Sequence, residues 1–531
     1  MNFHLQLPTN AVATVILFVT VLYFLYKIYN KKSSGNRNNN APPEAKGAWP
    51  IIGHLHLLGE TQLPHKVLGA MADTCGPIFT IKLGFRQALI VSDSEMAKVC
   101  FTTNDKDFAD RPTTVVSKLL GYNSGMFSFA PYGEYWRQVR KIITLELLSQ
   151  RRVEMLGHIR VSELKVSMKE IYEAWVKNKK LENSNTVKVE MKQWFGNLLL
   201  NIVLRSISGT RFAPDDEEGL RFQAVARKYF ELLAVFVVSD FIPFLKGFDV
   251  GGYEKAMKRT AKEIDEFLEG FLTEHRKVKE SGQQKDERDQ VFMDVLISIL
   301  ESVPQEDFNF DCGTIIKSSC LALLTAGLDT STVTLTWALS LLLNNPKALK
   351  IAQDEIHEHV GRERLVEESD IKNLVYLQAI IKETMRLYPA APLSVPHQSR
   401  QDCVVAGYNV PKGTRLFVNL WKVHRDPNVW SDPNEFQPER FLTSKSDIDV
   451  KGNHFELMPF GSGRRMCPGV YFSLKSMHLI LASLIQQFVF ERPSNELIDM
   501  SESFGLTNMK ATPLEVLVTP RLSTEMYHVG A

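Results

Sequence analysis

Cysteine is scarce in this chain, and no two cysteines have a Cys-x-x-Cys spacing. The six cysteines stand at positions 75, 100, 312, 320, 403 and 467 of 531 residues. This spacing suggests neither a disulfide framework nor a structural zinc site, and it is typical of a reducing compartment. A strong excess of one charge is also absent, because 62 Lys and Arg residues are balanced by 61 Asp and Glu residues. A protein that binds nucleic acid needs a basic face, so this balance argues against nucleic acid as the partner.

Charged residues are missing from the first 26 positions, where no Asp, Glu, Lys or Arg occurs. The apolar run within this stretch, extended by its flanking residues, predicts a transmembrane anchor at residues 1–30. A cleaved signal peptide is the alternative, but no Lys or Arg precedes the run, and bulky residues replace a small-residue cleavage site. Residues 31–50 then read as a polar linker and a proline-rich hinge. Everything downstream is placed on the cytoplasmic side by the basic residues Lys27, Lys31, Lys32 and Arg37.

Proline is absent from residues 311–345, and Asp329 is the only charged residue between positions 318 and 345. We expect one helix of roughly 50 Å here, ended by the proline that follows. A second membrane span is the alternative, but an acid and several hydroxyl groups at the centre of the run indicate a functional centre instead. Ala326 leaves room for a ligand, and Thr330 can donate to a carbonyl one turn earlier.

The residues around the last cysteine follow a long and specific spacing pattern. It follows the pattern Phe-x-x-Gly-x-Arg-x-Cys-x-Gly, formed by Phe460, Gly463, Arg465, Cys467 and Gly469. The glycines let the backbone approach a flat ligand closely. Pro468 and the apolar run 470–490 predict a helix whose N-terminus favours a thiolate. A lone cysteine is more often a small buried hydrophobic residue. The spacing here, however, resembles the haem-ligand loop of the cytochrome P-450 haem-thiolate monooxygenases.

The resemblance implies the cytochrome P-450 fold, which is mostly α with small β-sheets and has a triangular helical haem domain. That domain would span residues 51–531 as one unit behind the N-terminal membrane helix. Short β-type runs at residues 77–92 and 403–414 read as hairpins, and residues 415–419 read as a further strand.

The resemblance also assigns contacts to a haem b. Cys467 would ligate the iron as a thiolate. Trp136 and Arg140 lie four residues apart on one helical face, and both would meet a propionate. Without the resemblance, the pair reads as a core aromatic beside a solvated arginine, and His397 reads as a structural histidine. The expected haem-binding residues are Trp136, Arg140, His397, Phe460, Gly463, Arg465 and Gly469.

Two further groups of residues follow from the resemblance. Asp329 and Thr330 would deliver protons during oxygen activation. Glu383, Arg386 and Arg440 would form a buried ionic network that holds the cysteine loop in place. Read alone, Glu383 and Arg386 form an ordinary surface pair, three residues apart on a helix.

The substrate pocket is expected to be mostly apolar, which favours a small hydrophobic ring system as the substrate. Residues 222–238 read as a helix and residues 241–245 as an exposed hydrophobic turn. In the family this region lies over the pocket and dips into the membrane, whereas simple core packing is the alternative. A turn at residues 503–507 would project into the same pocket. The expected pocket residues are Val116, Phe127, Phe236, Ala326, Leu393 and Phe504.

Residues 49–55 and 367–380 are similar to the plant group that contains nicotine demethylases and hydroxylases of alkaloids, coumarins and flavones. The resemblance implies a single-pass protein of the endoplasmic reticulum membrane with a cytosolic catalytic domain. It would oxidise a small hydrophobic plant metabolite with O2 and electrons from NADPH. The expected electron donor is NADPH–cytochrome P-450 reductase, with cytochrome b5 as a second donor. Arg137 and Lys141, on the helix that carries Trp136, are candidates for docking an acidic partner, whereas a merely solvated surface is the alternative for such charges.

An alkaloid is the expected substrate, and a coumarin or flavone is the second expectation. Oxidative cyclisation, demethylation or C–C cleavage without retention of oxygen stays open as the reaction. A haem-binding sensor or electron carrier is a third alternative. Asp329 and Thr330 argue against it, because a carrier needs no proton relay.

Overall fold

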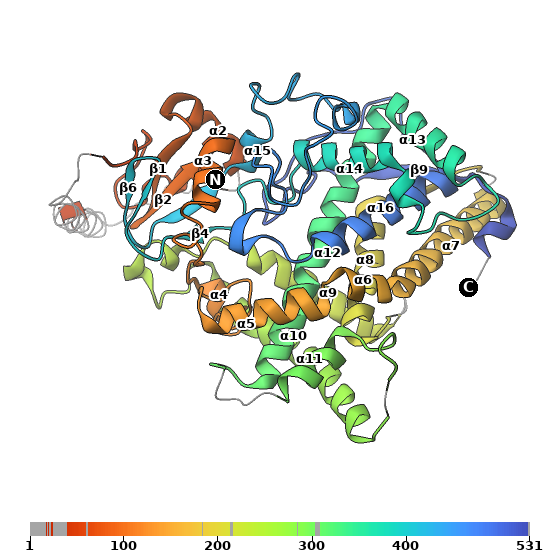
Figure 1. The fold of residues 1–531 in the computed structure, drawn as a ribbon, viewed down its shortest axis with the longest axis horizontal. Helices are drawn as coiled ribbons and strands as arrows, with labels where there is room; N and C mark the ends of the chain where they lie inside the picture. The colour runs from red at the N-terminus through yellow and green to blue at the C-terminus, as the bar shows by residue number, and fades with distance from the viewer. Residues whose placement is uncertain are drawn as a thin grey trace, which may run out of the picture.

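The structure is a computed structural model that describes residues 40–59, 62–182, 184–212, 216–283, 285–302 and 308–528, together with Leu17, Thr20, Tyr23 and Phe24. The predicted anchor, apart from those four residues, and residues 31–39 of the predicted linker therefore lie outside the described residues. Helices dominate the described part of the chain, as predicted. They are α2 (Pro64–Cys75), α3 (Ser94–Phe101), α4 (Val115–Leu119), α5 (Glu134–Ile142), α6 (Gln150–Met155), α7 (Gly157–Glu182), α8 (Met191–Ser208), α9 (Glu217–Leu233), α10 (Tyr253–Glu280), α11 (Phe292–Leu300), α12 (Cys312–Asn344), α13 (Pro346–His359), α14 (Val375–Leu387), α15 (Leu420–Val423) and α16 (Val470–Gln487) (Figure 1).

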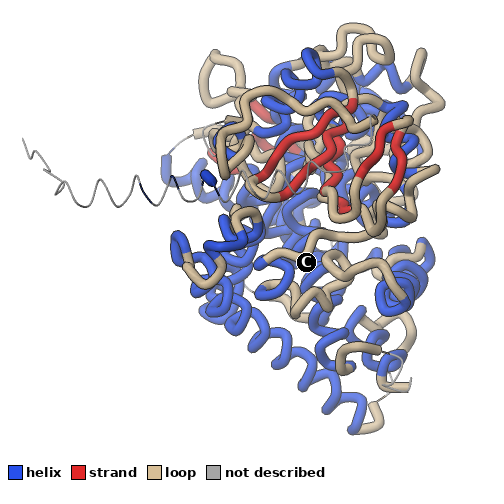
Figure 2. The backbone as a smooth tube through the Cα atoms, turned by 90° about the vertical axis from the view of Figure 1, so that its left-hand side faces the viewer, coloured by secondary structure: helices blue, strands red, loops and turns tan. Residues whose placement is uncertain are grey.

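One group of strands lies at the side of the molecule that faces the viewer in Figure 2, whereas Figure 1 shows β9 (Glu515–Pro520) towards the opposite side and helices in most of the remaining volume. The larger sheet has the order β1 (Ile78–Leu83), β2 (Arg86–Val91), β7 (Arg415–Val418), β4 (His397–Gln398). β1 and β2 pair antiparallel, which confirms the predicted first hairpin. β7 pairs parallel with β2, so a strand from late in the chain completes the early hairpin.

Two smaller sheets complete the β-structure of the described residues. β5 (Cys403–Val405) and β6 (Tyr408–Val410) form the second predicted hairpin. β3 (Val187–Glu190), β9 (Glu515–Pro520) and β8 (Phe488–Glu491) form the other, in that order. The C-terminal part of the chain is thereby fixed against the region that leads into α8.

The long helix α12 runs through the middle of the molecule, as Figure 1 shows. Its N-terminus is capped by the side chain of Asp311, which accepts from the backbone N–H of Thr314 at 2.9 Å. α12 packs against α8, α10, α14 and α16. Of the described helices, it alone is long and apolar enough to cross a membrane, but most of its side chains are buried inside the protein. Its composition therefore reflects a position in the core.

Two predictions for residues 222–245 were wrong in part. α9 ends at Leu233 and not at residue 238, because a run of β-branched and aromatic residues follows, which disfavours helix. Phe241 and Ile242 are buried and not exposed, and the carbonyl of Phe241 accepts from the N–H of Phe85 at 2.8 Å. This bond ties the segment after α9 to the turn of the β1–β2 hairpin.

The helix after the cysteine loop also differs from its predicted span. α16 begins at Val470, with Gly469 as its N-cap, so Pro468 stands outside the first helical turn. α16 ends at Gln487, and the residues that follow leave the helix to pair as β8 with β9. A non-local strand partner therefore decides where the apolar run changes from helix to strand.

Candidate functional site

The cysteine loop is a tight turn that hydrogen-bonds to itself. The backbone N–H of Cys467 donates to the carbonyl of Phe460 at 2.9 Å. Gly461 and Gly463 have φ values of 71° and 67°, which side-chain-bearing residues rarely adopt. A Cβ atom at Gly463 would lie 2.4 Å from Oδ1 of Asp105. Gly463 therefore allows the close approach of a protein segment, where a flat ligand was predicted.

The surroundings of Cys467 act on the pKa of its thiol in opposite directions. Burial raises its pKa, whereas a hydrogen bond from the backbone N–H of Gly469 and the positive charge of Arg140 lower it. Gly469 has an ordinary φ of −89°. The Cβ that it lacks would come within 3.8 Å of the Cys467 sulfur, so the small residue leaves space beside the thiol.

Three half-buried arginine side chains, Arg111, Arg140 and Arg465, gather near this loop without a counter-ion among the described residues. Burial and the charges of its arginine neighbours lower the pKa of Arg111 to about 9 and that of Arg465 to about 8. Burial also lowers the pKa of Arg140. Within the part of the chain that the structure describes, none of the three forms a salt bridge. Nε of Arg111 has no hydrogen-bond partner there.

The backbone and an aromatic ring fix the positions of these guanidinium groups. Arg465 donates to the carbonyls of Ala109 and Ala130, at 2.6 Å each, and lies 4.3 Å from the ring centre of Trp136. Arg140 donates to the carbonyl of Met466, next to the cysteine. These contacts hold two of the three guanidinium groups in place beside the cysteine loop.

His397 lies beside this cluster as a neutral ring. Its Nδ1 is 2.8 Å from the carbonyl of Phe108, to which it donates, so Nε2 is left as the acceptor. Burial and the charges of Arg111 and Arg465 hold its pKa well below the usual value. The predicted contacts Trp136, Arg140, His397 and Arg465 are therefore close to one another, and Arg111 joins them, which the sequence analysis missed.

These residues fit a haem. Guanidinium groups that are partly withdrawn from water and have no anion are costly, so the cluster is suited to a ligand with carboxylate groups, such as the propionates of a haem. A thiol beside them that can lose its proton supplies the soft ligand that iron accepts. A metal held by protein side chains alone would need several ligands, and among the described residues no group of three or more His, Cys, Asp or Glu is placed to bind one.

Glu383, Arg386 and Arg440 form the hydrogen-bonded network that the sequence analysis expected. All three side chains are buried, Glu383 and Arg386 completely. Nε and Nη2 of Arg386 donate to the two carboxylate oxygens of Glu383 at 2.7 and 2.8 Å. Nε of Arg440 and the backbone N–H of Gln437 donate to the same carboxylate at 3.1 and 2.9 Å.

His424 links this network to the cysteine loop. Its carbonyl accepts from Nη1 of Arg386 at 2.9 Å, and its Nε2 accepts from the backbone N–H of Met458 at 3.0 Å. Burial and the charge of Arg386 lower its pKa to about 3, so the ring is neutral and can accept. Met458 lies two residues before Phe460, at the start of the loop. The sequence offered no signal for His424, because both contacts join distant segments.

The centre of α12 presents Ala326 and Thr330 to open space. Oγ1 of Thr330 donates to the carbonyl of Ala326 at 2.8 Å, as expected. Ala326 is exposed, although the residues that flank this turn of α12 are mostly buried. This bond from the hydroxyl to the carbonyl one turn earlier is not special to Thr330. α12 remains a continuous helix at this point. The same bond to the carbonyl one turn earlier is made by Thr325, Thr332, Thr334 and Thr336.

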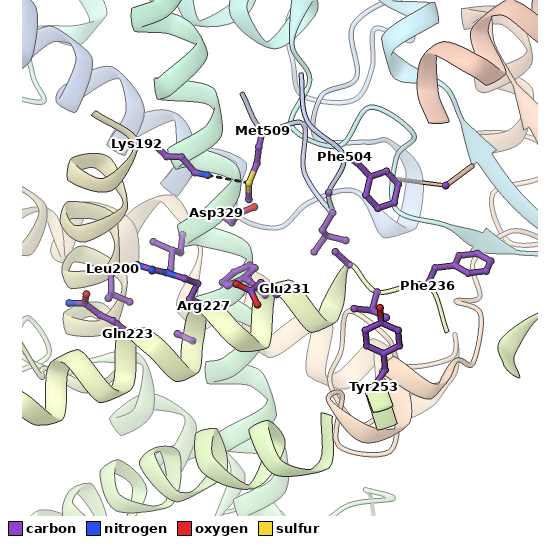
Figure 3. Close-up of a pocket in the computed structure, with 18 of the residues that line it drawn as sticks. Lys192, Leu200, Gln223, Arg227, Glu231, Phe236, Tyr253, Asp329, Phe504 and Met509 are labelled. Atoms are coloured by element: carbon purple, nitrogen blue, oxygen red, sulfur yellow. Dashed lines mark hydrogen bonds between the residues drawn. The ribbon is translucent and has the colours of Figure 1, made fainter. Parts of the chain in front are cut away.

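Asp329, the acidic residue within α12, points to a cavity of about 620 Å³ between α8, α9, α12 and the turn at residues 503–509 (Figure 3). Its Oδ2 accepts from Oγ1 of Thr507 at 2.5 Å. Burial raises the pKa of Asp329, whereas the hydrogen bond from Thr507 and the charge of Lys192 lower it. Neither Thr507 nor Lys192 was among the predicted site residues.

The cavity is mainly apolar, with polar groups on α8 and α9. Of the predicted pocket residues, Phe236 and Phe504 line it, together with Leu506 from the expected C-terminal turn. The other four lie elsewhere: Val116 and Phe127 are buried in the main core, Leu393 packs at the edge of a second core, and Ala326 lies on α12. They are not among the described residues that line this cavity. Polar lining groups are Lys192, Asn197, Gln223, Arg227, Glu231 and Asp329.

Comparisons with known proteins agree on one family. The family model described as cytochrome P450 matches residues 42–518. Strychnine-10-hydroxylase of Strychnos nux-vomica is 50% identical over 99% of this chain and 100% of its own length. Flavonoid-6-hydroxylase of Mentha piperita is 50% identical over 97% of this chain and 99% of its own length. A zebrafish cytochrome P450 solved with progesterone has a TM-score of 0.73 at 25% identity and covers 87% of this chain and 100% of its own.

Proposed function

Because the chain belongs to the cytochrome P450 family, and so is a monooxygenase that uses haem b and electrons from NADPH through a reductase, we propose that it hydroxylates an alkaloid. The observation that best supports this use of the site is the half-buried Cys467 thiol beside three half-buried arginines that have no counter-ion among the described residues. A flavone or a coumarin is the second candidate substrate, which the similarity to a flavonoid hydroxylase favours.

The residues around the cysteine loop would hold the haem. When bound, the haem supplies the activation of O2 and the oxidation of the substrate. Cys467 would ligate its iron as a thiolate, and Arg111, Arg140 and Arg465 would bind its two carboxylate groups. The predicted contacts Trp136, His397, Phe460, Gly463 and Gly469 would shape the surrounding space.

Asp329 and Thr330 would move protons on the other side of the site. Asp329 faces the cavity, from which it can exchange protons with water. Thr330 lies one residue further along α12, next to the space that Ala326 leaves open. Burial raises the pKa of Asp329, so this carboxyl holds a proton more readily than an exposed one, as a group that passes protons must.

The partners and the membrane position are part of the same proposal. Residues 51–531 would form one catalytic unit, anchored in the endoplasmic reticulum membrane by residues 1–30. NADPH–cytochrome P-450 reductase, with cytochrome b5 as a second donor, would supply the electrons. Arg137 and Lys141 are exposed on α5 and are available for an acidic partner, although Arg137 is paired with Glu134. Such an exposed ion pair is weak and can be exchanged on docking.

Product analysis tests the proposal directly. Microsomes that contain the full chain and a plant reductase would be given NADPH and, in separate reactions, alkaloids, coumarins and flavones. A product heavier by one oxygen atom from an alkaloid is the expected result. Loss of a methyl group or of two hydrogen atoms would identify demethylation or cyclisation, and no NADPH-dependent product from any class would contradict the proposal.

We expect Cys467→Ser to abolish both turnover and the spectrum of a thiolate-ligated haem. A serine hydroxyl is far less acidic than a thiol and is a harder ligand, so it cannot take the place of the sulfur. The measurement is the carbon monoxide difference spectrum of the reduced protein. Cys75→Ser, on α2, is the matched control and should retain the spectrum. A thiolate-type spectrum from Cys467→Ser would contradict the assignment.

A further inference from the structure

A hydrogen bond joins the acid of α12 to a threonine far along the chain. Oγ1 of Thr507 donates to Oδ2 of Asp329 at 2.5 Å, and Thr507 is buried. A hydroxyl that donates to a carboxylate favours the ionised form and fixes one of its two oxygens. The other oxygen of Asp329 is then the better placed of the two for exchange with the cavity.

The turn that carries Thr507 is held in place without this bond. The carbonyl of Asn508 accepts from Nε1 of Trp337 at 2.7 Å, and its N–H donates to the carbonyl of Ala390 at 2.9 Å. Nδ2 of Asn508 donates to Oε1 of Glu502 at 2.9 Å. Because Trp337 is itself on α12, two turns after Asp329, the turn and the acid belong to one rigid frame.

A buried carboxylate anchors the start of the same turn. Glu502 pairs with Lys66 of α2, and His65 lies 3.4 Å from it. These partners lower the pKa of Glu502 to about 2 despite its burial, so the anchor remains charged at neutral pH. Thr507 is therefore a donor in a fixed position, and removing its hydroxyl should leave the turn in place.

The same turn also lines the cavity. Phe504, Leu506 and Met509 face the cavity. Figure 3 shows Met509 beside Asp329. Nζ of Lys192 lies 3.4 Å from the Met509 sulfur. The other titratable groups that line the cavity are Arg227 and Glu231 of α9 and Tyr253 of α10. Of these charged groups, Lys192 is the one whose charge acts on Asp329.

We propose that Thr507 is a positioning residue for proton transfer, which holds Asp329 by one oxygen so that its other oxygen passes protons from the cavity towards Thr330. This inference rests on the proposed role of Asp329. It adds a residue from the C-terminal turn to a relay that the sequence placed entirely on α12. Because Thr507 lies on the turn at residues 503–509 and orients Asp329, the proton relay depends on how that turn packs against α12.

The test compares Thr507→Val, Thr507→Ser and Asp329→Asn in the full-length holoenzyme with its reductase, using NADPH and O2 as the probes. Valine keeps the shape and removes the hydroxyl, whereas serine keeps the donor.

Infrared spectra over a pH series should contain a band of the protonated Asp329 carboxyl that Asp329→Asn lacks. In Thr507→Val this band should persist to higher pH, and NADPH oxidation should be about tenfold slower with its pH profile moved in the same direction. Thr507→Ser should behave as the wild type in both measurements.

Two results would overturn the inference, and they can be told apart. If Asp329→Asn oxidises NADPH as the wild type does, the proposed role of Asp329 fails and the inference fails with it. If Asp329→Asn slows the reaction but Thr507→Val matches the wild type in the infrared series and in the pH profile, only the inference fails. Equal haem content in all variants excludes a folding defect as the cause of slower oxidation.

Discussion

At the scale of single residues, buried charges decide how this site is built. The carboxylate of Glu383 has lost all contact with water and receives four hydrogen bonds, two from Arg386 and one each from Arg440 and the backbone of Gln437. Both arginines are fixed by further bonds to backbone carbonyls of residues 424–435. Loss of any one of the three side chains would therefore leave a buried charged group without its partner. Through His424 the network also connects to the cysteine loop.

We expect Glu383→Ala to yield protein without bound haem. The substitution leaves two buried guanidinium groups without their carboxylate, which should cost about 3–5 kcal/mol of stability. The measurement is the ratio of haem to protein after purification, together with thermal unfolding. Asp354→Ala is the control, because the Lys350–Asp354 pair is exposed and should contribute little. Normal haem content in Glu383→Ala would show that the network does not hold the loop.

At the scale of elements, one turn before α5 is held in an unfavourable conformation. Tyr122, Asn123 and Ser124 have φ values of 51°, 54° and 65°, so three consecutive residues other than glycine are left-handed. The hydroxyl of Tyr122 donates to Oδ1 of Asp265 on α10 at 2.6 Å, and the N–H of Ser124 donates to the carbonyl of Ser117 at 2.8 Å. Such strain persists only where the surroundings enforce it.

We expect Asn123→Ala to destabilise the protein by about 1 kcal/mol, although the residue is exposed. Among the described residues its side chain forms no hydrogen bond, so the effect would come from backbone strain at φ 54°. The measurement is thermal unfolding, combined with hydrogen exchange of residues 115–127. Asn123→Gly is the matched control and should be close to neutral, because glycine adopts positive φ freely. Equal stability of the two variants would argue against strain in this turn.

At the scale of the whole molecule, exposed apolar side chains gather after α9. Phe236, Phe244, Phe248 and Val250 are exposed in this stretch. The ring of Phe244 lies 5.7 Å from that of Phe85, at the turn of the β1–β2 hairpin. The first described residues of the chain join the same part of the fold, since Ala45 donates to Thr80 of β1 at 2.9 Å. A predicted anchor that enters here would bring this apolar surface towards the membrane.

We expect Phe248→Ser to weaken binding to lipid vesicles in a shortened protein that begins at Asn40. Phe248 is 69% exposed, and an exposed aromatic ring gains free energy when it enters the lipid interface. The measurement is co-sedimentation with vesicles of phosphatidylcholine, where binding should fall several-fold. Leu497→Ser is the matched control, because Leu497 is 70% exposed but lies beyond β8. An equal loss in both variants would contradict an oriented contact.

The sequence by itself determined the features that depend on neighbours along the chain. The spacing around Cys467, the long apolar helix with Asp329 at its centre and the two hairpins are local patterns, and the structure contains that helix and those hairpins where they were expected. Only the tertiary structure decided where α9 and α16 end, that Arg111 and His424 belong to the site, and that Thr507 holds Asp329. Each of these depends on a contact between distant segments, such as the 178 positions that separate Asp329 from Thr507. Burial and hydrogen bonding between such segments are set by packing, which the order of residues along the chain does not display.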